Sequence, residues 1–450
     1  MVTASLSPPE NEGSPYRRLL ANRDYSRLWF GQLVSNIGTA ISSLALLFYA
    51  YALTNSPMAM AILAIAQTAP VVIFAGFVGV YIDRWNRKTI MVASDLVRAV
   101  LILLIPLSMY FPSIMPQIYW VYLLTFLYAI ANAWFFPARN ASIPNIVDSD
   151  ELVSANSLSQ MTFQVVQLTI PPLGGVLVAM LAPQYFLAFA INAFTFLLSA
   201  GSLWTIKKSL IPKDIIDKES VTRQVVQGAK YVSKNPILVY FFVFAILLAS
   251  SSGILNALLL PHLENQVGIN EADFGIVLSV GAAMGTIVAI IMGKRKKLPY
   301  PLYIVSFAGI IAGIGVLIFA AATSLWIVII SWALIGSVDV MLNIPLSTIM
   351  QDLVKDNYRG RVFALLNVVF TALQVLGMAL GGVWAELAGS SVPPLFAAGL
   401  LFVITSVLSV FYVAGRKLHQ QLDIMLTDSD IARDHEKESE SSEVVIETAV

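Results

Sequence analysis

The sequence contains no cysteine and few charged residues. None of its 450 residues is a cysteine, which excludes disulfide bonds, cysteine-ligated zinc and thiol catalysis. Only 12% of the residues are charged, compared with about 25% in soluble proteins, and the formal net charge is zero. The three histidines lie far apart, without metal-ligand spacing. We therefore expect no metal, no cofactor, no nucleic-acid partner and no enzyme active site.

Hydrophobic residues are abundant, at 58% of the chain, and they form long runs. A membrane-spanning helix needs about 20 apolar residues, and twelve segments meet that length. The predicted spans are 28–52, 59–82, 89–111, 117–137, 157–182, 184–206, 237–261, 273–293, 300–322, 324–348, 361–388 and 391–415. The predicted fold class is therefore an all-α polytopic membrane protein with twelve transmembrane helices in two six-helix repeats.

Lysine and arginine positions predict the orientation in the membrane. With these spans, every one of the 27 basic residues except Arg98 falls on the side that also carries both termini. Basic residues are enriched in cytoplasmic loops, so both termini are predicted to be cytoplasmic in a multi-pass protein of the cell (inner) membrane. An error of one span would have mixed the two sides.

The longest connection between spans divides the chain in two. The predicted segments are a cytoplasmic N-terminus (1–27), an N-terminal six-helix bundle (28–206), a cytoplasmic linker with a short amphipathic helix (207–236), a C-terminal six-helix bundle (237–415) and a disordered acidic tail (416–450). In the linker, Ser220 is a candidate cap for a helix with Val221 and Val232 on its apolar face. We interpret this helix as lying on the membrane surface or on the bundle, with a regulatory site as the alternative.

A weak internal repeat relates the two bundles. Val147 and the pair Gly174-Gly175 are matched, at an offset of 207 residues, by Val354 and the pair Gly381-Gly382. The offset superposes the fourth and fifth spans on the tenth and eleventh. Parallel six-helix repeats are typical of transporters that bind substrate between the halves, near the middle of the membrane.

The turn between the second and third spans carries four charges, Asp83, Arg84, Arg87 and Lys88, shortly after Gly79. A bilayer core tolerates no such cluster, so the turn is predicted to lie at a membrane surface. Its pattern, Gly-x-x-x-Asp-Arg-x-x-Arg-Lys, resembles the motif between helices two and three of the major facilitator superfamily. The usual glycine before the last basic pair is an asparagine here, and asparagine also tolerates positive φ.

Other stretches resemble the branch of that superfamily that contains macrolide exporters and the enterobactin exporter. They include Pro137-Ala-Arg139, Arg359-Gly-Arg361 and the residues that begin the first span. This resemblance covers about residues 20–415 and implies alternating access with export of drug-like or siderophore-like molecules. Branch members often have an acid after the glycine of helix one, where this chain has Gly38-Thr39, so one candidate proton carrier is missing.

Asp83 is predicted to belong to a cytoplasmic gate. A carboxylate at the C-terminal end of a helix opposes the helix dipole and needs a partner. The candidates are Arg139, Arg84 or Arg87, and the N-terminus of the eleventh helix near Arg361. The resemblance implies the last of these, with Asp83 clamping the two halves. The alternative is a solvated loop acid.

Three further charges fall inside predicted spans. Asp95 and Arg98 are spaced i, i+3 and can pair on one helix face. We favour a structural ion pair joined to the gate, with substrate contact as the alternative. Asp339 lies deep in the tenth span with no base in its own span, and its repeat counterpart is Asn132. It is interpreted either as a proton carrier or as a hydrogen-bonded structural acid.

Uncharged polar residues in the spans are candidates to line a central cavity. They are Gln32, Asn36, Asn132, Gln160, Gln164, Gln167 and Gln374. Three glutamines of the fifth span share one helix face. The alternative for each residue is an interhelical hydrogen bond.

These observations predict a secondary active transporter, most simply an exporter driven by protons. The alternatives are an importer or lipid-handling member of the superfamily, and a non-transporting membrane sensor or scaffold. The expected partners are membrane lipid, a small-molecule substrate and protons, and the chain is expected to act as a monomer.

Overall fold

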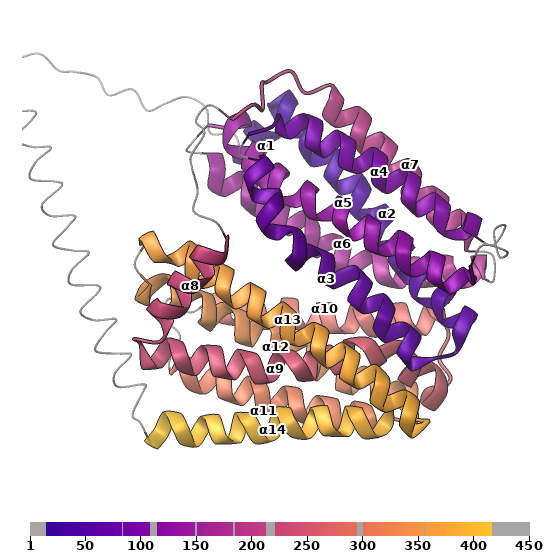
Figure 1. Cartoon of the computed structure of the whole chain (residues 1–450), viewed down its shortest axis with the longest axis vertical. Coiled ribbons are helices and arrows are strands. Elements are labelled where there is room, and N and C mark those ends of the chain that lie inside the picture. Colours follow the sequence, from indigo (N-terminus) through magenta and orange to yellow (C-terminus); the bar gives the residue numbers. More distant parts are fainter. Residues whose placement is uncertain are drawn as a thin grey trace, which may run out of the picture.

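The computed structural model describes residues 15–82, 84–108, 115–148, 151–182, 185–212, 221–294, 300–354 and 356–415. Every regular element in these ranges is helical. Within the same ranges, 12 helices are long and apolar enough to cross a membrane (Figure 1). The predicted all-α, twelve-span fold is therefore confirmed.

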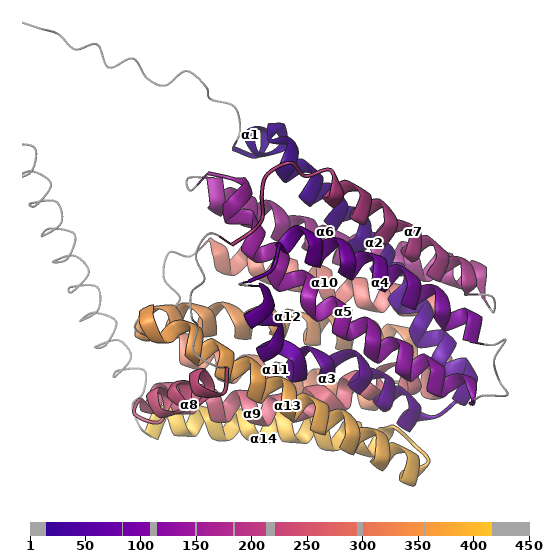
Figure 2. The same cartoon turned by 45° about the horizontal axis from the view of Figure 1, so that its top comes forward.

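The spanning helices form two bundles that follow one another in the chain. The N-terminal half comprises α1 (Pro15–Ala21), α2 (Arg23–Thr54), α3 (Pro57–Ile82), α4 (Arg87–Leu107), α5 (Gln117–Ile146), α6 (Leu152–Leu181) and α7 (Phe186–Trp204). The C-terminal half comprises α8 (Val221–Val232), α9 (Pro236–His262), the π-helical turn η3 (Leu263–Val267), α10 (Glu271–Gly293), α11 (Pro301–Ala320), α12 (Leu325–Leu353), α13 (Asp356–Ala388) and α14 (Val392–Gly415). Figure 2 shows the two bundles side by side.

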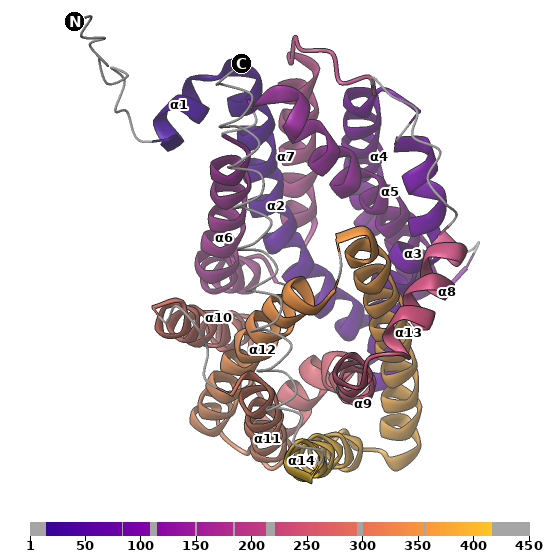
Figure 3. The same cartoon turned by 90° about the vertical axis from the view of Figure 1, so that its left-hand side faces the viewer.

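The two ends of the molecule differ in charge. We name the end with α1, the α3–α4 turn and α8 the basic end, because the described lysines and arginines other than Arg98 lie toward it. Figure 3 views the helices from this end. The opposite end is named the acidic end. Its charged residues, within the described ranges, are Glu264, Glu271, Asp273 and Glu386.

The halves meet chiefly along two helix pairs, α3 with α13 and α6 with α10. Glycines bring α6 and α10 into backbone contact. A Cβ atom on Gly175 would lie 2.5 Å from the carbonyl oxygen of Glu271, and one on Gly275 would lie 2.3 Å from that of Pro171. Any larger residue at either position would push the helices apart, so this close approach depends on the absence of side chains.

Two local expectations were wrong. The fourth span does not end at residue 137, because α5 continues through Pro137 and Pro144 to Ile146. Arg139, beyond the predicted end of that span, therefore lies in a helix and is only 8% exposed. Each proline removes one backbone hydrogen bond, and α5 nevertheless stays helical through both. Asn86 has a φ of −63°, so it needs no positive-φ tolerance, and its side chain caps α4 by accepting the Lys88 N–H.

The linker helix lies on the C-terminal bundle. Helix α8 packs against α13, and Val232 is buried with Val362 and Leu365. Tyr231 of α8 stacks on Tyr358 of α13, with ring centroids 4.7 Å apart. The suggested cap Ser220 and the predicted acidic tail 416–450 lie outside the described residues.

Candidate functional site

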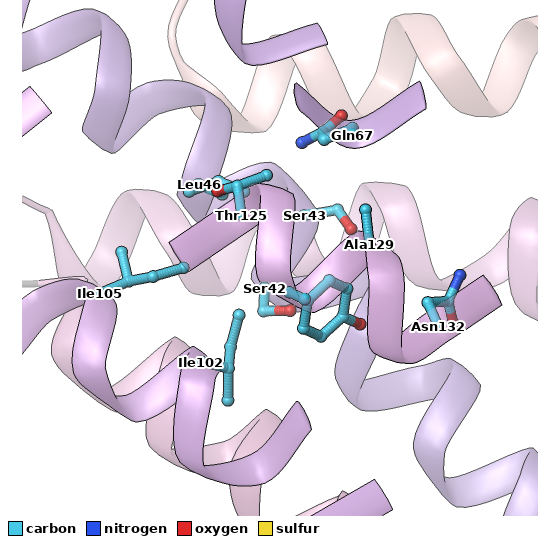
Figure 4. Close-up of a pocket in the computed structure, with 10 residues that line it drawn as sticks. Ser42, Ser43, Leu46, Gln67, Ile102, Ile105, Thr125, Ala129 and Asn132 are labelled. Atoms are coloured by element: carbon cyan, nitrogen blue, oxygen red, sulfur yellow. The ribbon is translucent and has the colours of Figure 1, made fainter. Parts of the chain in front are cut away.

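A polar chamber lies where the N-terminal half meets α10. It consists of two adjoining cavities of about 170 and 440 Å³ that share Ser43 and Asn132. The smaller cavity is enclosed by α2, α3, α4 and α5 (Figure 4), and the larger extends to Leu278 and Ala282 of α10. We call the two together the central chamber. The polar residues that line it are Asn36, Thr39, Ser42, Ser43, Gln67, Arg98, Thr125, Asn132 and Gln167, with Tyr128 beside them.

Arg98 is the cation of the central chamber, and it is neutralised from within its own half. Its guanidinium pairs with the carboxylate of Asp95, as the i, i+3 spacing predicts. It also donates to the Asn132 side-chain oxygen at 3.0 Å. The guanidinium carbon lies 4.3 Å and 4.4 Å from the ring centroids of Phe135 and Phe196. Because Arg98 lines the larger cavity, it is placed to contact a bound solute, while Asp95 is fully buried behind it.

The structure separates the other predicted cavity residues. Asn36, Asn132 and Gln167 line the central chamber. Gln160 and Gln164 are exposed on α6, nearer the basic end, and do not line it. Gln32 is buried and Gln374 is half-buried, and neither lines a cavity described here. Of the three glutamines that share this face of α6, Gln167 alone lines the chamber, so a shared helix face did not predict how far along α6 the chamber reaches.

A second cavity of about 370 Å³ lies in the C-terminal half. Its lining is mainly apolar, with phenylalanines such as Phe244 and Phe370, and its polar side chains include Asp339, Asn343 and Asn367. The Asp339 carboxylate accepts a hydrogen bond from the Asn343 amide at 2.9 Å. No lysine or arginine is among the described residues that line this cavity. Asp339 is therefore an acid without a cationic partner in its cavity wall.

The repeat explains this difference between the halves. The offset of 207 residues places Asp339 at the position of Asn132, and Val305 at the position of Arg98. Val305 lines the cavity with Asp339, as Arg98 lines the central chamber with Asn132. The central chamber thus contains an arginine paired with an acid, whereas the described lining of the C-terminal cavity contains the carboxylate of Asp339 and no base.

The hydrogen bonds between described residues of the two halves lie at the acidic end. The Tyr185 hydroxyl donates to the Glu271 carboxylate at 2.9 Å. Glu386 accepts the Ser56 hydroxyl at 2.7 Å and the Met58 N–H at 3.4 Å, at the N-terminus of α3. Burial raises the pKa of the Tyr185 phenol, and Glu271 raises it further, so Tyr185 stays protonated as the donor. We call these two contacts the acidic-end latch.

The predicted gate residues lie at the basic end. Asp83 is outside the described residues, and Gly79 lies in the last turn of α3. Arg87 donates to the Ala141 carbonyl at 2.7 Å, and Lys88 donates to the Ile206 carbonyl at 2.9 Å, so both tie α4 to neighbouring segments of its own half.

Three arginines complete the predicted gate. Arg84 is exposed. Arg139 donates to Asn140 at 3.0 Å. Arg361 lies over the Tyr358 ring at 5.2 Å, beside α8. A clamp between the halves at this end therefore stays a prediction.

Sequence reasoning missed the residues of the acidic-end latch. Glu271, Tyr185 and Glu386 belong to no motif, and their partners are far away in the chain. The signal in the sequence was indirect. Glu271 and Glu386 lie near the connections on the side opposite the termini, and those connections carry no lysine or arginine that could pair with them. Such acids need hydroxyl or N–H partners, and the opposite half supplies them.

Among the described residues, twelve helices long enough to span a membrane, in two bundles, with a chamber where the N-terminal bundle meets α10, define a membrane transporter. The family model described as Major Facilitator Superfamily matches residues 28–373 and 245–426. The chain therefore belongs to the major facilitator superfamily, as the turn motif predicts.

Known proteins resemble the chain over most of its length. The uncharacterized MFS-type transporter YfiS of Bacillus subtilis is 26% identical over 89% of this chain and 94% of its own length. Macrolide efflux protein A of Streptococcus pyogenes is 23% identical over 80% of this chain and 89% of its own. Among solved structures, a bacterial homologue of the iron transporter ferroportin in an inward-facing state has a TM-score of 0.68, at 16% identity, covering 86% of this chain and 99% of that one.

Proposed function

We propose that this chain exports a bulky, partly apolar small molecule across the cell membrane in exchange for protons. The observation that carries the proposal is a chamber where the N-terminal half meets α10, combined with hydrogen bonds that join the halves at the acidic end. In this proposal the molecule is inward-facing, and rocking of the halves would break the acidic-end latch and expose the chamber on the other side.

The direction of transport follows from charge and resemblance. Basic residues favour the cytoplasmic side, which places the basic end and both termini in the cytoplasm of an inner membrane. The similarity to a macrolide efflux protein supports outward transport of drug-like molecules, and the branch resemblance supports siderophore-like molecules as a second class. The mixed lining of the central chamber, with Phe136, Phe163 and Leu47 beside Asn36 and Gln167, suits such a solute.

Asp339 is the proposed proton carrier. It is an acid in a largely apolar cavity with no base in the described wall, and its neighbour Asn343 is uncharged. A carboxyl that faces a dry surrounding in one state and water in the other would take up and release a proton as the halves move. Thr39, at the position where branch members often have an acid, lines the central chamber but cannot carry a proton.

The test uses the purified protein in vesicles with an imposed pH gradient and a labelled macrolide as the first probe. The Asp339→Asn variant should lose uphill transport driven by pH while it still binds and exchanges substrate. Asp148→Asn, the same substitution at an exposed residue outside the cavities, should keep both activities. If Asp339→Asn still accumulates substrate against its gradient, the coupling site lies elsewhere.

The same vesicles separate the alternatives. Net flux toward the face that carries the basic end would indicate an importer. Movement of labelled phospholipid, with no flux of drug-like or siderophore-like probes, would indicate a lipid-handling member. Absence of flux for all probes, with binding retained, would favour a non-transporting sensor.

A further inference from the structure

The largest cavity described here lies outside the transport chamber, on the outer face of the N-terminal half. It is a groove of about 850 Å³ between α4 and α5. Val97 of α4 lines it and is 47% exposed, whereas Asp95 and Arg98 of the same helix point to the interior. Because the groove lies on the face of α4 that points away from the bundle interior, it opens toward membrane lipid.

The length of the groove matches one leaflet of the membrane. Along α4 it runs from Thr89 near the basic end to Leu101. At 1.5 Å per residue, these positions are about 18 Å apart along the helix. The hydrocarbon core of a bilayer is about 30 Å thick, so an occupant reaches from the basic-end surface to roughly the middle of the membrane.

The groove changes character along this length. Its deep part is apolar, with Leu101, Leu127 and Ile130, and its mouth carries Arg84, Trp85 and Asn86. Trp85 and Trp134 stack beside the mouth, with ring centroids 6.2 Å apart and planes 19° apart. Tryptophan favours the headgroup level of a bilayer, so the mouth has the composition expected at a membrane surface.

Arg84 is the basic residue of this turn that remains available to a ligand. Arg87 and Lys88 donate to backbone carbonyls of their own half. Arg84 is exposed, and within the described residues no hydrogen bond or ion pair engages its guanidinium. A guanidinium presents a planar fork of donors that matches a phosphate group.

We propose that this groove binds one anionic phospholipid of the basic-end leaflet, with an acyl chain between α4 and α5 and the phosphate against Arg84. The apolar depth, the leaflet length and the exposed Arg84 at the mouth each match one part of that ligand. The site depends on the chain being embedded in a membrane and not on which solute it transports.

The test is native mass spectrometry of the delipidated protein in detergent, titrated with phosphatidylglycerol or with phosphatidylcholine of the same acyl chains. The wild type should bind one phosphatidylglycerol about fivefold more tightly than phosphatidylcholine, as expected for one basic contact at a membrane surface. Arg84→Gln should bind both lipids equally. Arg23→Gln removes an exposed arginine at the same end but outside the groove, and it should keep the preference.

A second variant tests the groove itself. Ala131→Phe places a ring in the apolar channel and should abolish the tightly bound lipid of either class, while the melting temperature reports that the variant is folded. If the wild type shows no preference between the lipids, or if Arg84→Gln keeps it, the phosphate contact is refuted. If Ala131→Phe binds lipid like the wild type, the lipid lies elsewhere on the surface and the groove assignment is wrong.

Discussion

Loss of the Tyr185–Glu271 hydrogen bond should shift the protein toward opening at its acidic end. The bond joins α10 to the residue that precedes α7, and the Tyr185 side chain is only 6% exposed. A hydrogen bond to a charged acceptor contributes about 1.5–3 kcal/mol. We take the lower value, because both groups regain water when the halves separate. About 1.5 kcal/mol corresponds to a tenfold change in the open population.

The absence of cysteine makes this shift measurable. A single Ala257→Cys substitution places a thiol in the packed contact between α9, Ala61 and Met378, where Ala257 is 2% exposed. Its reaction rate with an impermeant maleimide then reports the open population. Adding Tyr185→Phe should raise that rate about tenfold, and Glu271→Gln should raise it in the same direction.

A neighbouring tyrosine provides the matched control. Tyr49 contacts the Tyr185 ring, but its hydroxyl is bonded to Gln117 within the same half. Tyr49→Phe should therefore leave the labelling rate unchanged. The Tyr185→Phe/Glu271→Gln double variant should label no faster than the faster single variant, because both remove one interaction. An unchanged rate for Tyr185→Phe, or fully additive effects, would refute the reasoning.

Two further predictions concern the buried pair and the orientation. Arg98→Met should destabilise the protein in detergent by about 3–5 kcal/mol, because Asp95 is left buried without its cation. In thermal unfolding, the Asp95→Asn/Arg98→Met double variant should recover much of that loss of stability. A double variant as unstable as the single one would contradict the explanation. For the orientation, a thiol introduced by Thr323→Cys, in the turn between α11 and α12 at the acidic end, should react with an impermeant reagent in intact cells. A thiol introduced by Ser209→Cys should react only after permeabilisation, and the reverse pattern would invert the proposed direction of export.

The architecture could be predicted from the sequence because each span is a local signal. Runs of apolar residues fix the helices, and the one-sided placement of lysine and arginine fixes how they alternate. The ion pair of Asp95 and Arg98 was also predictable, since its spacing is set by the helix itself. Helix ends were less predictable: α5 continues through Pro137 and Pro144, although each proline removes a backbone hydrogen bond.

Contacts between distant parts of the chain could not be predicted from the sequence. Nothing in it pairs Tyr185 with Glu271, since that contact depends on how closely α6 and α10 approach at Gly175 and Gly275. The same limit applies to the chamber. Gln160 and Gln167 share a face of α6, yet Gln167 lines the chamber and Gln160 does not, because the chamber boundary depends on helices of both halves.

The composition of the acidic-end latch determines how closure responds to ionic strength. Both carboxylates of the latch bind hydroxyl or N–H groups across the interface, and the described residues at that end include no lysine or arginine. Dissolved salt screens attraction between opposite charges, and within the described residues the latch contains no such ion pair. Closure of the acidic end should therefore weaken less as salt is added than a closure built from ion pairs would.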